Sequence, residues 1–103
     1  MTLKQAVKEV IEQNTTVCRY RPTRFIQMTK NGEVENLKEV ISGLVLDPEK
    51  MDRIITDLEK YKGKPIFIEE FIAMCGFGLA NKVIREAIQR AEVIQKLRLS
   101  YIK

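Results

Sequence analysis

Apolar residues recur every three or four positions over most of the chain, and this spacing predicts amphipathic helices. The clearest case is residues 2–13, where a single stripe carries Leu3, Ala6, Val7, Val10 and Ile11. Thr2 and Gln5 have the spacing of a capping box at its start, and we expect Asn14 to close the helix. Because the stripe has normal width, core packing is favoured over a partner-binding helix.

Residues 17–32 fit two different structures. Residues 17–21 alternate apolar and polar side chains, which predicts a short strand or extended segment. After Pro22 the chain forms either a short helix or, over residues 24–30, a strand that leads into a hairpin turn at the Asn-Gly pair 31–32. The helix is slightly favoured, because proline fits a first helical position and glycine fits just past a helix end.

Two further helices are predicted in the middle of the chain. The first covers residues 33–45, although Gly43 weakens it by about 1 kcal/mol relative to alanine. The second starts at Asp47 and Pro48, which suit the N-cap and the first turn, and it ends at Gly63. Its apolar face consists of Met51, Ile54, Ile55, Leu58 and Tyr61.

Residues 65–99 predict a short helix, a glycine turn and a longer helix. Pro65 fits the first turn of the short helix, Gly76 fits its end, and we expect Cys75 to be buried on its apolar face. The longer helix should start near Leu79. Its apolar line is Leu79, Val83, Ile84, Ala87, Ile88, Ala91 and Ile94, and its other face carries Asn81, Lys82, Arg85, Gln89, Arg90 and Lys96.

The end of the chain changes its period. Over residues 96–102 apolar and polar side chains alternate, which predicts a short strand, while continuation of the helix to about Arg98 fits equally well. An edge strand here would be a docking site for another copy of the chain.

These elements predict a single mainly α domain over residues 1–103, with about five helices around one core. A minor short-strand element and a helix-turn-helix-like carboxyl-terminal half complete the prediction. A length of 103 residues suits one domain, and 45% hydrophobic with 31% charged residues is typical of globular proteins. The chain has no run of about 18 apolar residues, so we expect no membrane span, and its amino terminus does not resemble a secretory signal.

The composition argues against most catalytic chemistry. Histidine is absent, which removes the commonest general base and the commonest zinc ligand. Two distant cysteines do not make a zinc site, and the glycines at 76 and 78 lack the rest of a nucleotide-binding motif. We therefore expect a non-enzymatic protein with no metal and no small-molecule cofactor. Because nothing indicates a disulfide framework, we expect a reduced, cytoplasmic chain.

The net charge of +4 is unevenly distributed. Residues 14–32 contain four bases and no acid, and residues 82–103 contain six bases and two acids. Between them, residues 33–62 contain five bases and eight acids. If the two basic segments meet in space, they form a patch suited to phosphates or to an acidic protein.

The leading functional prediction is a small nucleic-acid-binding or nucleoprotein-associated domain that uses basic segments 19–30 and 82–98. Lysine and arginine would hold phosphates, and arginine, asparagine and glutamine have the geometry to read base edges. A helix after a tight turn presents such residues in helix-turn-helix proteins. The predicted contact residues are Arg19, Arg21, Arg24, Asn81, Lys82, Arg85, Gln89 and Arg90.

Two other interpretations stay open. The same polar faces are typical of ordinary solvated helices and loops. The chain could also be a protein-interaction module, such as a homodimer, an adaptor or a small inhibitor of a larger enzyme. Its surface would then be an apolar patch ringed by arginines, because Tyr and Arg are common interface anchors. The predicted patch is Phe67, Phe77, Leu97, Leu99 and Tyr101.

Overall fold

The computed structural model describes residues 1–18 and 34–101, and these residues fold into helices without a strand. The elements are α1 (Leu3–Cys18), α3 (Val34–Leu46), α4 (Pro48–Lys60), α5 (Ile68–Cys75) and α6 (Asn81–Ser100). The prediction of a mainly α fold with about five helices is therefore confirmed for the described part of the chain.

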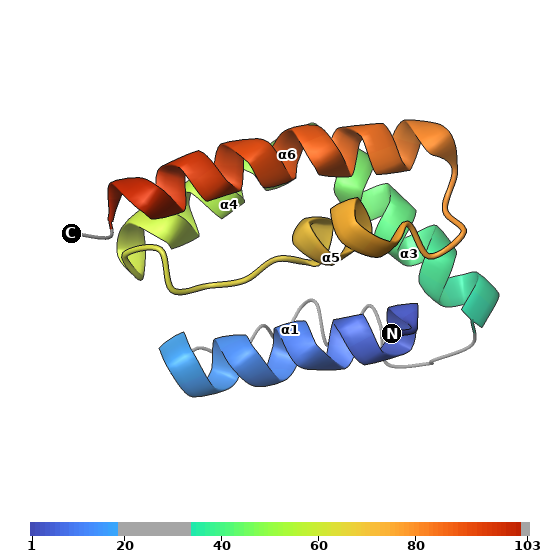
Figure 1. Cartoon of the computed structure of the whole chain (residues 1–103), viewed down its shortest axis with the longest axis horizontal. Helices are drawn as coiled ribbons and strands as arrows, with labels where there is room; N and C mark the ends of the chain where they lie inside the picture. Colours follow the sequence, from blue (N-terminus) through green and yellow to red (C-terminus); the bar gives the residue numbers. More distant parts are fainter. Residues whose placement is uncertain (19–33, 102–103) are drawn as a thin grey trace.

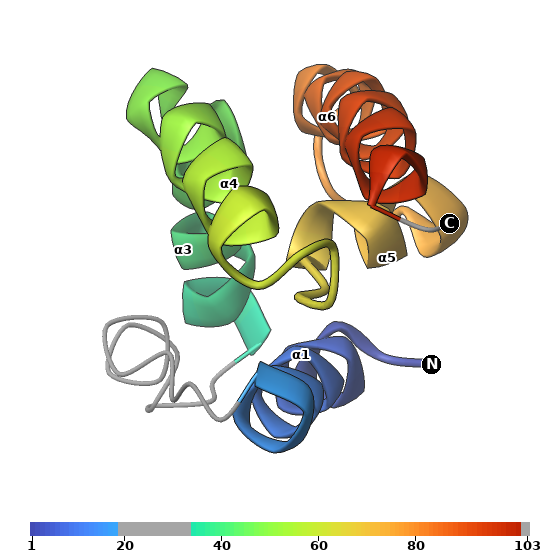
Figure 2. The same cartoon turned by 90° about the vertical axis from the view of Figure 1, so that its left-hand side faces the viewer.

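The helices are arranged with α5 at the centre. Figure 1 shows α6 and α1 on opposite sides of the molecule, with α5 between them. The view along the helices shows α3 and α4 together on one flank (Figure 2). The long helix α6 therefore lies along one edge of the structure.

Two apolar clusters hold the helices together. The larger one joins α1, α3, α5 and the first half of α6, and its buried residues are Leu3, Ala6, Val7, Val10, Leu37, Ile41, Val45, Ile68, Ile72, Leu79, Val83 and Ala87. The smaller one joins α4 to the second half of α6 through Ile54, Leu58, Phe67 and Ile94. Since α6 contributes side chains to both clusters, it is the element that connects them.

The local signals for helix starts and ends are confirmed at several places. The backbone N–H of Gln5 donates to the Thr2 hydroxyl at 3.1 Å, and the Thr2 N–H donates to the Gln5 amide oxygen at 2.7 Å. The Asp47 carboxylate accepts a hydrogen bond from the Glu49 N–H at 3.0 Å. Gly63 and Gly76, which follow α4 and α5, have positive φ angles of 79° and 71°.

Helix α1 is longer than predicted. It continues past Asn14 to Cys18, so the predicted strand is wrong for Val17 and Cys18. The Thr15 hydroxyl donates to the Ile11 carbonyl at 2.7 Å, which keeps this threonine compatible with the helix. The rest of the segment with two predicted structures, up to residue 32, lies outside the described residues.

Helix α5 starts at Ile68 rather than at Pro65, which corrects the prediction. The preceding segment is extended, with φ −132° and ψ 149° at Phe67. Its backbone groups make tertiary hydrogen bonds, because Asn14 pairs with both the N–H and the carbonyl of Ile66, at 2.8 and 2.9 Å. In an extended chain the backbone N–H and carbonyl of Ile66 can both reach Asn14 on another helix, whereas backbone groups inside a helix bond to one another.

The carboxyl-terminal end of α6 also holds the extended segment that precedes α5. The Arg98 guanidinium donates to the carbonyls of Gly63 at 3.1 Å and Pro65 at 2.7 Å, and it forms a two-point ion pair with Glu70. Because α6 stays helical through Ser100, the alternative strand is wrong for residues 96–100. Residues 102–103 lie outside the described part.

The predicted burial of Cys75 is wrong, because its thiol is free and exposed. Cys75 is the last residue of the eight-residue helix α5. Residues earlier on the same apolar face, such as Ile68 and Ile72, are 1% and 0% exposed. The covering elements therefore end before the last turn of α5.

Candidate nucleic-acid interface

The amino-terminal half of α6 exposes a polar face. Asn81, Lys82, Arg85 and Gln89 are all solvent-exposed. They lie on one side of the helix because Val83, Ala87 and Ile94, at 1%, 0% and 0% exposure, face the two apolar clusters. Four of the predicted contact residues are thus together on one surface, which we call the α6 face.

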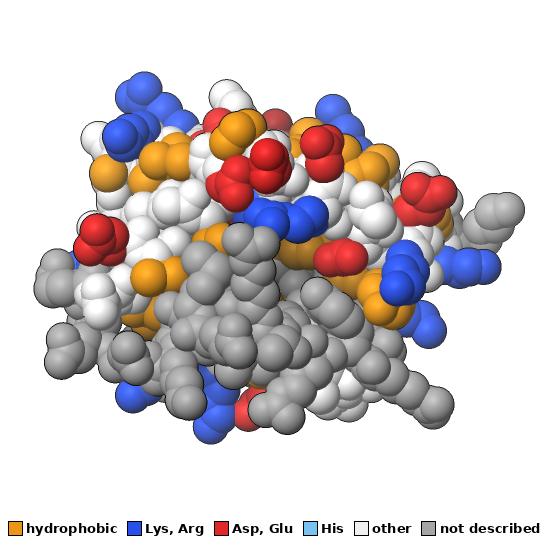
Figure 3. All heavy atoms as spheres, turned by 180° about the vertical axis from the view of Figure 1, so that it is seen from behind, with side chains coloured by type: hydrophobic (Ala, Val, Ile, Leu, Met, Phe, Trp, Pro, Cys, Tyr) orange, Lys and Arg blue, Asp and Glu red, His pale blue; other side chains and the backbone are white. Residues whose placement is uncertain are grey.

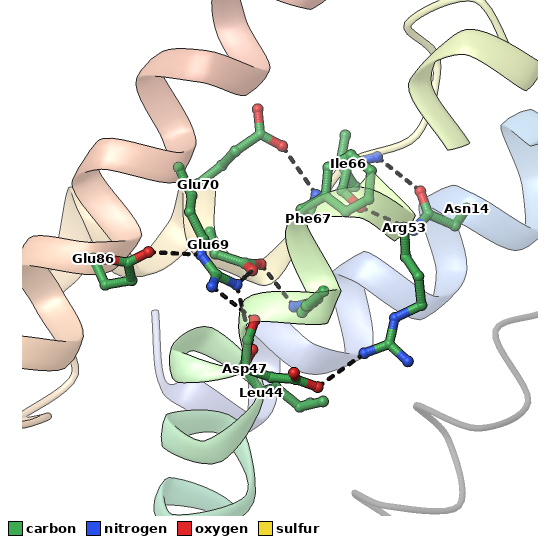
Figure 4. Close-up of polar contacts among 11 residues, drawn as sticks. Asn14, Leu44, Asp47, Arg53, Ile66, Phe67, Glu69, Glu70 and Glu86 are labelled. Carbon is green, nitrogen blue, oxygen red and sulfur yellow. Dashed lines mark hydrogen bonds and ion pairs between the residues drawn. The ribbon is translucent and has the colours of Figure 1, made fainter. Parts of the chain in front are cut away.

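Arg90 is not part of this surface, which corrects its predicted place on the outer side of the helix. It is 5% exposed. Its guanidinium donates to the Asp47 carbonyl at 2.8 Å and to the Glu86 carboxylate at 3.0 Å. A second carboxylate, that of Glu69, lies 3.7 Å from Nη1 (Figure 4). Arg90 therefore joins α6 to α5 and to the start of α4.

The sequence did contain a signal for this inward position. Arg90 is three residues after Ala87 and four before Ile94, which places it on the buried line of α6. Glu69 precedes Ile72 by three residues, and Asn14 follows Val10 by four. These polar residues stand at apolar-stripe positions, and all are buried with tertiary partners.

Lys82 and Arg85 of the α6 face, and Lys96 further along the helix, differ from the other arginines of α6 in having no ion pair within the described part of the chain. Lys82, Arg85 and Lys96 are exposed, and none forms an ion pair with the described residues. Arg98, in contrast, is paired with Glu70. Among the described residues of α6, the acid classed as exposed is Glu92, which lies on the same side of the helix four residues before Lys96. The α6 face therefore carries an excess of positive charge that is available to a ligand.

The turn before α6 adds positive potential at its amino-terminal end. Residues 76–80 form the turn, and Gly76, Phe77 and Gly78 all have positive φ angles, of 71°, 55° and 72°. The N-cap residue Ala80 makes no side-chain hydrogen bond to the helix. The Lys38 ammonium lies close to Gly78, at 3.5 Å from the position that a Cβ there would occupy. The amino-terminal end of the helix dipole is positive, and the charge of this ammonium adds to it.

The other predicted basic segment is not tested. Arg19, Arg21 and Arg24 lie outside the described residues, so the relation between this segment and the α6 face is not described either. The five-residue turn between α5 and α6 is longer than the three or four residues common in helix-turn-helix motifs. The resemblance to that motif therefore stays a prediction.

The predicted apolar interaction patch is not assembled as expected. Phe67 is 8% exposed and belongs to the smaller core cluster, so its surface position is wrong. Phe77 and Leu97 are half-buried, while Leu99 and Tyr101 are 60% and 36% exposed. Figure 3 shows the molecule from behind the view of Figure 1, where the hydrophobic side chains of the described residues lie in small groups beside charged ones.

Other classes of site are not found in the described part of the chain. Among residues 1–18 and 34–101, no three His, Cys, Asp or Glu side chains are grouped so that they could hold a metal ion. No described helix is both long and apolar enough to cross a membrane. Comparison of the chain with protein-family models, with curated proteins and with solved structures gives no match. The functional argument therefore depends on the α6 face itself.

Proposed function

We propose that this chain is a small, non-enzymatic nucleic-acid-binding domain that uses the α6 face. The observation that supports the proposal is the exposure of Lys82 and Arg85 without an acidic partner among the described residues. Exposed lysines elsewhere, such as Lys4, Lys62 and Lys64, also form no ion pair with the described residues. Lys82 and Arg85 differ from them because they share one helix face, where both can neutralise phosphates. Asn81 and Gln89 flank them on the same face.

The side chains divide into two roles. Lys82, and Lys96 further along the helix, would contact phosphates as point charges. Arg85 has the planar donor pair that matches a guanine edge, and the amides of Asn81 and Gln89 match an adenine edge. Arg90 has no direct role, because its donors are engaged inside the protein.

We also propose a cytoplasmic location. Cys75 is a free, exposed thiol. Reducing compartments keep thiols in this form, while extracellular environments favour disulfides.

A binding titration with matched charge variants tests the function. Lys82→Ala with Arg85→Ala removes two cations from the α6 face, and Lys4→Ala with Lys8→Ala removes two from α1 on the opposite side. We expect the α6 double variant to bind labelled nucleic acid at least about tenfold more weakly at low salt, because two phosphate contacts are lost. The α1 variant should stay within about twofold of the wild type.

Two results would contradict the proposal. One is the absence of salt-dependent binding by the unmodified chain. The other is an equal loss of affinity in both double variants, which would show that only net charge matters. All four substituted residues are exposed, so thermal unfolding monitored by circular dichroism should give the melting temperature of the wild type for both double variants.

A further inference from the structure

The exposed side of α6 has no aromatic side chain on which bases could stack. Its exposed residues are Asn81, Lys82, Arg85, Ile88, Gln89, Glu92, Val93, Gln95, Lys96, Leu99 and Ser100. Proteins that bind single strands commonly combine a basic groove with aromatic side chains that stack on successive bases. The α6 face provides the charge without the aromatic platform, so unpaired bases gain little from it.

The position of residues 81–89 of α6 suits insertion into a groove of a double helix. Helix α4 begins beside Arg90, where the Asp47 carbonyl accepts its hydrogen bond, and α4 packs against Ile94 further along. Residues 81–89 therefore extend past α4, and α6 lies along an edge of the molecule (Figures 1 and 2). An α-helix with its side chains is about 10–12 Å wide, which matches the B-form major groove of about 12 Å.

Two lysines lie near the two ends of the exposed side of α6. Lys82 and Lys96 are fourteen residues apart, which is about 21 Å along a helix. With residues 81–89 in the groove, Lys82 would lie at one end of the inserted stretch and Lys96 beyond its other end, where each could contact backbone phosphates that border the groove. Between them, Arg85 and Gln89 lie within the stretch that would face base edges, and the exposed Glu92 follows this stretch on the same side.

From these three observations we infer that the ligand of the α6 face is double-stranded DNA, with the amino-terminal half of α6 in the major groove. The inference rests on the proposed function and specifies its ligand. Duplex RNA is disfavoured, because its A-form major groove is too deep and narrow for side chains to read. Single strands are disfavoured by the lack of aromatic side chains on the face.

The test compares three labelled probes of equal length and matched sequence: duplex DNA, single-stranded DNA and duplex RNA. Fluorescence anisotropy is measured over a salt series for the full chain and for three single variants, Lys82→Ala, Arg85→Ala and Lys96→Ala. We expect duplex DNA to bind at least about tenfold more tightly than either other probe. Each of the two lysine variants should reduce the slope of log K against log salt by about 0.9 for duplex DNA.

The outcomes separate the inference from the function on which it rests. Equal or tighter binding of single-stranded DNA, or of duplex RNA, overturns the inference and leaves nucleic-acid binding intact. Salt-dependent preference for duplex DNA with unchanged slopes in all three variants overturns the assignment to the α6 face. No salt-dependent binding of any probe overturns both. Lys4→Ala is the matched control, since Lys4 is an exposed lysine of α1, and its slope should equal that of the wild type.

Discussion

Glu69 is the charged residue most completely removed from solvent, at 0% exposure. Its Oε1 accepts a hydrogen bond from the Lys50 ammonium at 2.9 Å. Its Oε2 has no hydrogen-bond partner among the described residues and lies 3.7 Å from Nη1 of Arg90. A carboxylate in this position links α5 to both α4 and α6, and its charge compensates two cations in the interior.

Glu69→Ala should be strongly destabilising. It leaves the cations of Lys50 and Arg90 in the interior without their shared carboxylate, and breaking a buried pair in this way typically costs about 3–5 kcal/mol. Glu86→Ala is the matched control, because Glu86 pairs with the same Arg90 but its side chain is 37% exposed. We expect the control to lose about 1 kcal/mol or less. Urea unfolding measures both, and equal losses would contradict this account.

Asp57 predicts a pH dependence of stability. Burial raises the pKa of its carboxyl above the ordinary 3.8, and the charges of Lys60 and Arg53 partly oppose this shift. The folded state then binds this proton more tightly than the unfolded chain does. Asp57 therefore makes the free energy of unfolding fall as pH rises from below 3.8 through the folded pKa.

Asp57→Asn should remove that contribution. We expect the variant to be more stable than the wild type at about pH 7 and equally stable at about pH 3, where the carboxyl is protonated in both states. Asp52→Asn, on the exposed side of α4, controls for the loss of one negative charge. Denaturant unfolding at the two pH values provides the measurement. A variant less stable than the wild type at about pH 7 would reverse the sign and refute the prediction.

At the residue scale, exposure was harder to predict than helix formation. The polar character of Arg90 indicated an outer position, yet the carbonyls at the junction of α3 and α4 provide its partners. These partners come from residues more than forty positions away, so a local pattern does not contain them. The exposed positions of Lys82 and Arg85 follow from the helical period alone.

At the scale of elements, glycine has no structural role in helix α3, whereas the turn after α4 requires it. Gly43 lies exposed inside α3, and a Cβ built on it has no neighbour within 4 Å. Gly63 has a φ angle of +79°, and its Cβ would lie 3.3 Å from Cγ of Arg98. Glycine is thus required after α4 and dispensable within α3.

The two glycine-to-alanine substitutions should change stability in opposite directions. Gly43→Ala should raise the free energy of unfolding by about 0.5–1 kcal/mol, because alanine loses less conformational entropy in a helix. Gly63→Ala should lower it by more than about 1 kcal/mol, because alanine disfavours a positive φ and its methyl group crowds Arg98. Thermal or urea unfolding of the two variants tests the contrast. A change of the same sign in both would rule out this explanation.

The elements were predicted well where local signals agree with tertiary packing. Asp47 and Pro48 start α4 as expected, because the cap needs only nearby backbone groups. Pro65 was a misleading signal, since its neighbour Ile66 is held extended by Asn14 of α1. The predicted burial of Cys75 at the end of α5 was also wrong. Periodicity shows which face of a helix is apolar, but it does not show where the helices that cover this face end.

At the scale of the whole molecule, we expect the two apolar clusters to unfold as one cooperative unit. Helix α6 contributes Val83 and Ala87 to the larger cluster and Ile94 to the smaller one. The ion pairs of Glu69 with Lys50 and Arg90 connect α4, α5 and α6 as well. Loss of either cluster therefore weakens the helix on which the other depends.

Ile94→Ala tests this coupling. Ile94 is 0% exposed in the smaller cluster, and such a truncation typically costs about 2–5 kcal/mol. We expect amide hydrogen exchange to accelerate in α1 as well as in α4, although α1 contributes no residue to the smaller cluster. An increase confined to α4 and the end of α6 would show that the clusters unfold separately. Ile88→Ala, on the exposed side of α6, is the control and should leave exchange in α1 unchanged.

The arginines that fasten α6 would also limit how much conformational freedom the protein loses in the proposed complex. Arg90 and Arg98 donate to backbone carbonyls of other segments, so α6 is prevented from rotating about its own axis. We expect the proposed ligand to meet a surface that is already oriented, so that the entropic cost of ordering is limited to the long side chains that would touch it. That cost is about 0.5–1.5 kcal/mol for each immobilised side chain, far less than folding a segment on contact would require. The proposed interface would thus be preorganised by arginines that take no part in the contact itself.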